Sequence, residues 1–189
     1  MHRARAVVLD ACVLADFIIS DLLLRMAEEP VLILPRWSAE IFAEVRRTHR
    51  KLKWEDLIAE SWQESVREAF PESFFDPPKE VISRLRNHPK DRHVLGTAII
   101  SRAETIVTYN LRDFKPTALE PWGVVAISPD DLLCQLYESH PDLVALKVMD
   151  MANRHTLKGL IFKIRRSAPK LAEAIERDSR RHSRGFSDN

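Results

Sequence analysis

The chain has 189 residues, 45% of them hydrophobic and 30% charged, a balance typical of one globular domain with a sizeable core. Its net charge of +1 does not indicate a nucleic-acid partner, and its four glycines form no G-x-G-x-x-G or Walker loop that would cradle a nucleotide. The two cysteines form neither a disulfide framework nor a zinc spacing, and no long apolar segment follows the start. These features predict a cytoplasmic protein without a membrane span.

Strand and helix patterns alternate along the first two-thirds of the chain. We expect strands at residues 6–9, 31–34, 105–109 and 124–127, and helices at residues 13–26, 38–48, 52–70, 80–86 and 89–103. After Pro129 the pattern is helical almost to the end. This alternation favours an α/β fold in which helices flank a parallel sheet, followed by a C-terminal helical extension. We therefore expect the chain to divide into residues 1–130 and residues 131–189.

Four carboxylates stand where a strand ends or where a helix buries its apolar face: Asp10, Glu44, Asp91 and Asp113. A carboxylate that loses water is costly unless it is paired or binds a cation. In a parallel sheet, the carboxyl ends of the strands open into one crevice. The four side chains therefore predict one shared acidic pocket that holds a divalent cation.

Each carboxylate also has an ordinary structural explanation. Asp10 could cap the next helix, and Asp91 could be a first-turn residue that the helix dipole favours. Asp113 could be a turn residue. Glu44 could lie at the rim of the apolar stripe beside an arginine, and Glu40, on the same side of that helix, stays open as its alternative. The joint occurrence of the four favours the pocket, and Glu44 is preferred because Glu40 belongs to the first turn.

Four segments, taken in this order, resemble a PIN domain: residues 9–14, 38–45, 91–98 and 107–114. The last has the form V-T-x-N-x-x-D-F and is the most specific. The resemblance covers roughly residues 5–130. It implies a metal-dependent nuclease, and many bacterial PIN domains are toxins of type II toxin–antitoxin pairs. It maps the metal-binding, catalytic set onto the four carboxylates, with Asn110 and Thr108 in support.

One position departs from the family pattern. Two residues after the first aspartate the family usually has Asn or Ser, whereas this chain has Cys12. A thiol is a weak donor and a weak acceptor. A weakened contact to Asp10 would lower metal affinity or activity by about 10–100-fold, although Cys12 could equally be an inert buried residue. The departure keeps open a non-catalytic PIN-like module that binds RNA or a protein.

The carboxylate set suits Mg²⁺ or Mn²⁺ rather than zinc, because hard cations prefer oxygen ligands. Such a site needs no side-chain nucleophile. His88 and His93 flank Asp91 and are expected to be solvated rather than to bind metal. The resemblance therefore implies an endoribonuclease that hydrolyses RNA phosphodiester bonds. A phosphatase of another doubly wound fold is the weaker alternative, because no D-x-D follows the first strand.

Basic residues close to the carboxylates are candidates to hold RNA phosphates: Arg46, Arg47, Arg50, Lys90 and Arg92. Any one of them could instead belong to a solvated surface. Residues 158–184 contain nine Lys or Arg against three acids, a basic tail that could bind RNA, an acidic partner or nothing specific. The expected partners are RNA and an antitoxin protein, and a homodimer is left open.

Overall fold

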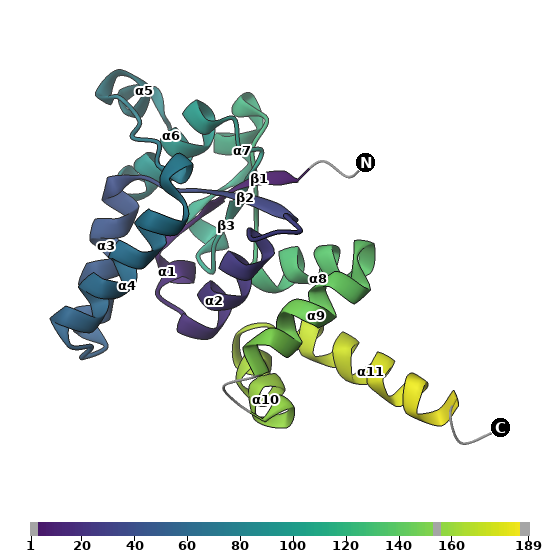
Figure 1. The fold of residues 1–189 in the computed structure, drawn as a ribbon. Coiled ribbons are helices and arrows are strands. Elements are labelled where there is room, and N and C mark those ends of the chain that lie inside the picture. The colour runs from purple at the N-terminus through teal and green to yellow at the C-terminus, as the bar shows by residue number, and fades with distance from the viewer. Residues whose placement is uncertain (1–3, 153–155, 186–189) are drawn as a thin grey trace.

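Four parallel strands form the central sheet of the protein, whose computed structural model describes residues 4–152 and 156–185, with the backbone alone for residues 181–185. The strands are β1 (Arg5–Leu9), β2 (Ile33–Arg36), β3 (Thr105–Val107) and β4 (Val125–Ile127), in the order β2-β1-β3-β4 (Figure 1). Val8 of β1 pairs with Arg36 on one side and with Ile106 on the other. The carboxyl ends of β1 and β3 therefore lie side by side, and the predicted parallel α/β architecture is confirmed.

Helices cover both faces of this sheet. The α-helices are α1 (Ala11–Leu14), α2 (Phe17–Met26), α3 (Ala39–Lys51), α4 (Asp56–Ala69), α5 (Lys79–Arg84), α6 (Arg92–Ser101), α7 (Pro116–Leu119), α8 (Pro129–Ser139), α9 (Pro141–Ala152), α10 (Leu157–Ser167) and α11 (Pro169–Gly185). Single 3₁₀ turns are η1 (Pro71–Ser73), η2 (Pro89–Asp91), η3 (Leu111–Asp113) and η4 (Glu120–Trp122). Helix α6 contacts β1, β2 and β3, whereas α2 and the C-terminal helices lie on the other side of the sheet (Figure 1).

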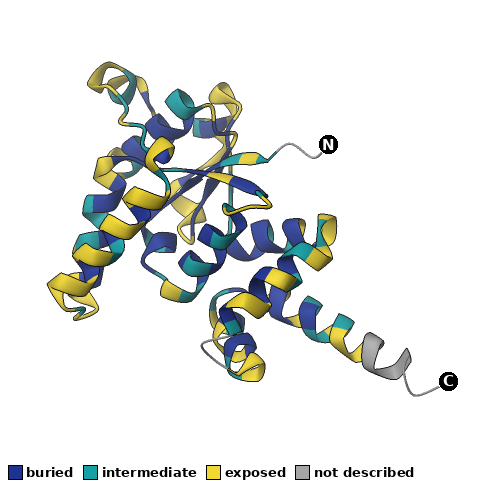
Figure 2. Ribbon diagram, viewed as in Figure 1, coloured by how far each residue is buried: buried dark blue, intermediate teal, exposed yellow. Residues whose placement is uncertain are grey.

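One hydrophobic core joins the sheet to the C-terminal helices. Val7, Val8 and Leu9 of β1 are fully buried, because a central parallel strand with both faces covered must be apolar throughout. Leu132 of α8 and Leu160 of α10 belong to the same cluster, and buried residues run without a break from the sheet into these helices (Figure 2). The C-terminal helical extension therefore packs on the sheet-bearing part, and the domain boundary at residue 130 stays a prediction.

Most expected elements differ from the structure only at their end residues, but two differ in more than that. The helix expected at residues 13–26 is two helices, because Asp16 interrupts it and caps α2 by accepting a hydrogen bond from the backbone N–H of Ile19 at 3.3 Å. The strand expected at residues 31–34 is shifted to Ile33–Arg36. Pro35 was expected to end this strand but lies within it, because β2 is an edge strand, where proline is tolerated.

Over the residues that the structure describes, the C-terminal helical extension consists of four helices, α8–α11, in line with the helical pattern after Pro129. The Asp130 carboxylate in α8 accepts hydrogen bonds from the backbone N–H groups of Lys170 and Leu171, at 3.1 and 3.0 Å, and so caps α11 from another helix. The side chains of Arg181 and Arg184, which we included in the basic tail, lie outside the described residues. In the two stretches that the structure describes, no helix is both long and apolar enough to cross a membrane.

Candidate active site

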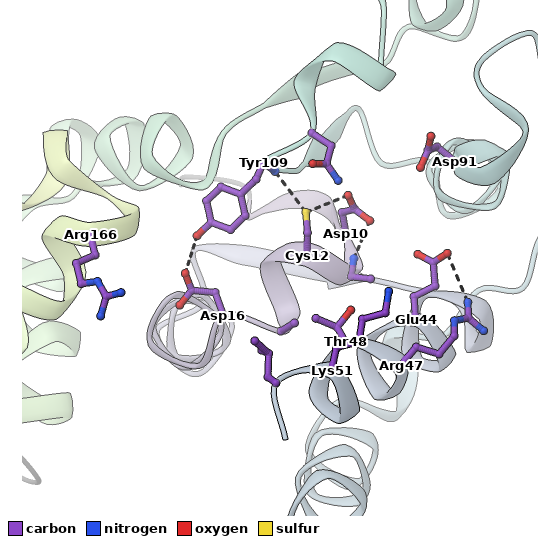
Figure 3. A pocket seen from close by; sticks show the side chains of 14 residues that line it. Asp10, Cys12, Asp16, Glu44, Arg47, Thr48, Lys51, Asp91, Tyr109 and Arg166 are labelled. Carbon is purple, nitrogen blue, oxygen red and sulfur yellow. Dashed lines mark hydrogen bonds and ion pairs between the residues drawn. The ribbon is translucent and has the colours of Figure 1, made fainter. Parts of the chain in front are cut away.

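A cavity of about 670 Å³ opens at the carboxyl ends of β1 and β3, within the usual range for a small-ligand site. Asp10, Glu44 and Asp91 line it, from the end of β1, from α3 and from the start of α6 (Figure 3). Asn110, from the loop after β3, lines it as well. Three of the four predicted carboxylates therefore share one cavity, as does Asn110.

Asp10 is the most firmly held of these carboxylates. It is 5% exposed, and its Oδ2 accepts a hydrogen bond from the Thr108 hydroxyl at 2.6 Å. Its Oδ1 accepts one from the backbone N–H of Ala11 at 2.7 Å, so Asp10 also caps α1. Asp10 therefore caps a helix, as its structural explanation has it, and also lines the cavity, while its role in a metal site stays a prediction.

Cys12 makes the contact to Asp10 that its family position had put in doubt. Its Sγ donates to Asp10 Oδ2 at 3.2 Å and accepts a hydrogen bond from the backbone N–H of Tyr109 at 3.4 Å. Burial and then the charge of Asp10 raise the pKa of the Cys12 thiol to about 12. The sulfur therefore stays protonated at neutral pH and can donate to the carboxylate.

Glu44 is half-buried on α3 and lies between two basic side chains. Its carboxylate is 3.6 Å from His93 Nε2 and 3.5 Å from an Arg47 guanidinium nitrogen. The contact with His93 outweighs partial burial and lowers the pKa of Glu44. Glu40 does not line this cavity but borders the next one, beside Lys90. The geometry therefore favours Glu44 over Glu40.

His93 contradicts our expectation of a solvated side chain. It is 8% exposed, because α6 packs against the sheet and turns the ring toward Glu44 on α3. Burial alone would lower the pKa of His93, but the contact with Glu44 and its negative charge leave that pKa raised. When it is protonated, the imidazole pairs with the Glu44 carboxylate across this 3.6 Å contact.

Asp91 and Asp113 interact through their charges. Asp91, at the end of η2, is partly buried and lines the cavity. Burial raises its pKa, and the charges of Asp113 and then Asp10 raise it further. Asp113, in η3, is exposed and is not among the cavity-lining residues. Asp113 therefore lies beside the cavity and contributes negative charge to it.

The five basic candidates separate into different surroundings. Arg47 lines the acidic cavity. Arg46 and Arg50 instead form ion pairs with two acids on the neighbouring helix α4. Arg46 lies 2.8 Å from Glu60, and Arg50 lies 2.9 Å from Asp56. Lys90 borders the neighbouring cavity, and Arg92 donates to the backbone carbonyl of Asn87 at 3.2 Å. Lys51, which belongs to the basic run that follows Glu44, also lines the acidic cavity. Cavity-lining polar residues that the sequence analysis missed are Asp16, Thr48 and Tyr109. Helical spacing from Glu44 could have found Thr48. Arg166 was predicted only as one member of the basic tail, and no local signal placed it at this cavity.

The donor chemistry of the cavity fits a hydrated hard cation. Its acidic side chains offer carboxylate oxygens, and the negative charges of Asp113 and Asp10 add to burial in raising the pKa of Asp91. Among the described residues, no group of three or more His, Cys, Asp or Glu side chains is gathered closely enough to hold an ion by itself. Mg²⁺ commonly keeps several waters and uses only one or two carboxylates directly, which is compatible with this spacing.

A PIN domain family model matches residues 6–112, more than half of the chain. The chain belongs to the PIN domain family. A relative in Mycobacterium tuberculosis (strain ATCC 25618 / H37Rv), named "Putative ribonuclease VapC50", is 45% identical over 74 residues. The matched stretch is 38% of this chain and 44% of the relative, so less than half of the relative's length is covered. No solved structure matches the chain.

The PIN domain match ends inside η3. Asp10, Glu44, Asp91 and Asn110 fall within it, and Asp113 falls one residue beyond its end. Helices α8–α11 lie wholly outside it. The PIN domain in this chain is therefore joined to a helical extension that the family model does not describe.

Proposed function

We propose that this PIN domain protein is an endoribonuclease that hydrolyses RNA phosphodiester bonds with Mg²⁺ or Mn²⁺. The observation that carries the proposal is the shared cavity: Asp10, Glu44 and Asp91 come from three separate elements and line one space. The name of the Mycobacterium tuberculosis relative supports the same activity.

In this proposal Asp10, Glu44, Asp91 and Asp113 are the catalytic, metal-binding carboxylates, directly or through water. A bound Mg²⁺ or Mn²⁺ would supply an activated water and would stabilise charge at phosphorus. Such chemistry needs no nucleophilic side chain.

The chain's own residues hold the carboxylates in position. Thr108 and Cys12 orient Asp10 through hydrogen bonds at 2.6 and 3.2 Å. His93 and Arg47 orient Glu44 from opposite sides. These contacts fix the orientation of the Asp10 and Glu44 carboxylates before a cation binds. The free-energy cost of assembling the metal site is therefore lower.

Basic side chains around the cavity would hold the RNA backbone. Arg47 and Lys51 line the cavity itself, and Lys90 borders the next one. Arg92 lies one residue from Asp91. Phosphate contacts of this kind supply affinity and register, not sequence preference. Arg46 and Arg50 are weaker candidates, because each is already paired with an acid on α4.

We further propose that the protein acts in the cytoplasm as the toxin of a toxin–antitoxin pair, with a small antitoxin protein as its partner. PIN domain membership and two free cysteines support this assignment. The adjacent reading frame is the first place to seek the partner. Its product should copurify with this chain and suppress RNA cleavage, and a product that does neither would oppose the assignment.

The decisive experiment compares the parent protein with Asp10→Asn on a mixed RNA pool, with Mn²⁺ and with EDTA. Asn keeps the shape of the side chain but removes the charge that would hold the cation. Cleavage should fall by about 100-fold or more, because a metal contributes several kcal/mol to such reactions. Asp142→Asn, on an exposed residue of α9, makes the same chemical change away from the cavity and should retain cleavage.

RNA binding should largely persist in Asp10→Asn, because basic residues supply that affinity. Equal cleavage by the parent and Asp10→Asn, or cleavage that ignores EDTA, would point to a contaminating nuclease. Binding without any cleavage by the parent would favour a non-catalytic PIN-like binding module.

A further inference from the structure

Helix α10 of the C-terminal helical extension forms one side of the acidic cavity. Arg166 lines that cavity together with Asp10 and Glu44 (Figure 3). A second cavity, of about 490 Å³, lies between α10 and the start of α2 and includes Lys163. Asp16 and Arg166 line both cavities. The two cavities therefore adjoin each other at Asp16 and Arg166, and Lys163 lines the second one.

Hydrogen bonds fix the end of α10 at this place. The Ser167 hydroxyl donates to Asp16 Oδ2 at 2.6 Å, and the Tyr109 hydroxyl donates to the same oxygen at 3.0 Å. The backbone N–H of Tyr109 donates in turn to Cys12 Sγ, which contacts Asp10. A continuous set of hydrogen bonds therefore links α10 to the carboxylate at the end of β1.

Packing holds the same end of α10 independently of these polar contacts. Ile164 and Ala168 are fully buried, on the turns that precede and follow Arg166. Arg166 itself is exposed. Its backbone is therefore held firmly while its side chain remains available to a ligand.

Within the described part of the chain, Arg166 differs from the neighbouring arginines in having no acidic partner. Arg165 pairs with Glu176, and Arg47 pairs with Glu40 and Glu44. Among the residues that the structure describes, Arg166 makes neither a hydrogen bond nor an ion pair. An anion could therefore bind this guanidinium without displacing an existing partner.

We propose that α10 is a wall of the RNA site and that Arg166 binds a phosphate of the strand as it passes Asp16. The inference rests on the proposed ribonuclease function and adds a specific substrate contact from outside the PIN domain match. A guanidinium suits this role because its planar donors match phosphate oxygens in pairs. The carboxylates at the centre of the cavity repel the phosphates of the RNA backbone. The positive charge of Arg166 at the edge of the cavity therefore sets where the RNA strand enters. Asp16, Ser167 and Tyr109 are positioning residues for α10.

The test measures RNA binding and cleavage separately in Arg166→Gln, Arg166→Lys and Lys158→Gln. Lys158 is the matched control, because it is an exposed cation on the same helix and lines neither cavity. A labelled single-stranded RNA pool in EDTA gives the dissociation constant at several salt concentrations without cleavage. Initial rates with Mn²⁺ then give kcat and KM, and thermal melting checks that each variant is folded.

Arg166→Gln should weaken RNA binding about tenfold and reduce the slope of log Kd against log salt by about 0.7, the value for one phosphate contact on a single strand. KM should rise by a similar factor with kcat nearly unchanged, because a remote phosphate contact acts in the ground state and the transition state alike. Arg166→Lys should keep the salt slope. Lys158→Gln should match the parent in Kd, salt slope, KM and kcat.

Two outcomes separate the inference from the proposed function. If the parent cuts RNA but Arg166→Gln matches Lys158→Gln in salt slope and KM, the Arg166 contact is overturned and the ribonuclease proposal stands. Arg166 would then be free for another partner, such as an acidic peptide. A parent that neither binds nor cuts RNA overturns both proposals.

Discussion

Thr108 donates a 2.6 Å hydrogen bond to Asp10 across 98 positions of the chain. Thr108 directly follows β3 and Asp10 directly follows β1, and these two strands are neighbours in the sheet. Both side chains are buried, so the bond is shielded from water. The hydroxyl therefore fixes the direction of the carboxylate that the proposed function depends on most.

Thr108→Val should lower the free energy of unfolding by about 1.5–3 kcal/mol without changing side-chain shape. It removes the buried hydrogen bond to the charged Asp10 acceptor and the 3.0 Å bond that the hydroxyl accepts from the backbone N–H of Asn110. Urea unfolding in EDTA measures this. Thr97→Val is the control: Thr97 is equally buried, but its hydroxyl donates to the neutral carbonyl of His93 at 2.8 Å. Equal losses in the two variants would show that the carboxylate bond adds nothing special.

Substitution of Cys12 should separate its donor role from its packing. Cys12→Ser retains a donor within reach of Asp10, whereas Cys12→Ala removes the 3.2 Å contact. Mn²⁺ affinity, measured by calorimetry, should be preserved in Cys12→Ser and fall by about 10–100-fold in Cys12→Ala. If the serine and alanine variants bind Mn²⁺ equally, Cys12 is an inert residue.

Asp91→Asn should stabilise the metal-free protein at neutral pH. Burial and the charges of Asp113 and Asp10 raise the pKa of Asp91 from 3.8, so its contribution to stability is present below that value and is lost as pH rises through the raised pKa. The asparagine variant cannot ionise, so its advantage over the parent should shrink as pH falls toward about 4. Urea unfolding of the parent and of Asp91→Asn, at neutral pH and at about pH 4, measures this difference in stability.

Mn²⁺ should reduce the stability advantage of Asp91→Asn over the parent. Millimolar Mn²⁺ should raise the melting temperature of the parent by mass action, and should raise that of Asp91→Asn less. Potassium chloride at matched ionic strength is the control for charge screening. A parent melting temperature that ignores Mn²⁺ would support the non-catalytic alternative.

His49 should make the protein sensitive to mild acid. It is 1% exposed and stacks on Trp54 with the ring centroids 4.1 Å apart. Burial lowers the pKa of His49 from 6.5, so its contribution to stability is present above 6.5 and is lost as pH falls toward the lowered value. His49→Phe keeps a stacked ring that does not titrate. Between about pH 8 and about pH 5.5, His49→Phe should lose less unfolding free energy than the parent, and equal losses would contradict the prediction.

Local patterns were sufficient for the parallel α/β architecture and for the positions of Asp10 and Asp91. A strand with both faces covered must be apolar, and a carboxylate at its end is visible in the sequence. The bounds of β2 were predicted less well, because Pro35 is acceptable only at a sheet edge and edge position is a property of the whole sheet.

The sequence by itself determined the order of the main strands and helices, and that Asp10 follows a strand and Asp91 begins a helix, because these depend on neighbours along the chain. Only the tertiary structure decided that His93 faces Glu44, that Arg46 and Arg50 turn to α4, and that Ser167 meets Asp16 across 151 positions. Those contacts depend on how buried helix faces pack against one another. No pattern within a single helix specifies the partner on which that helix will rest.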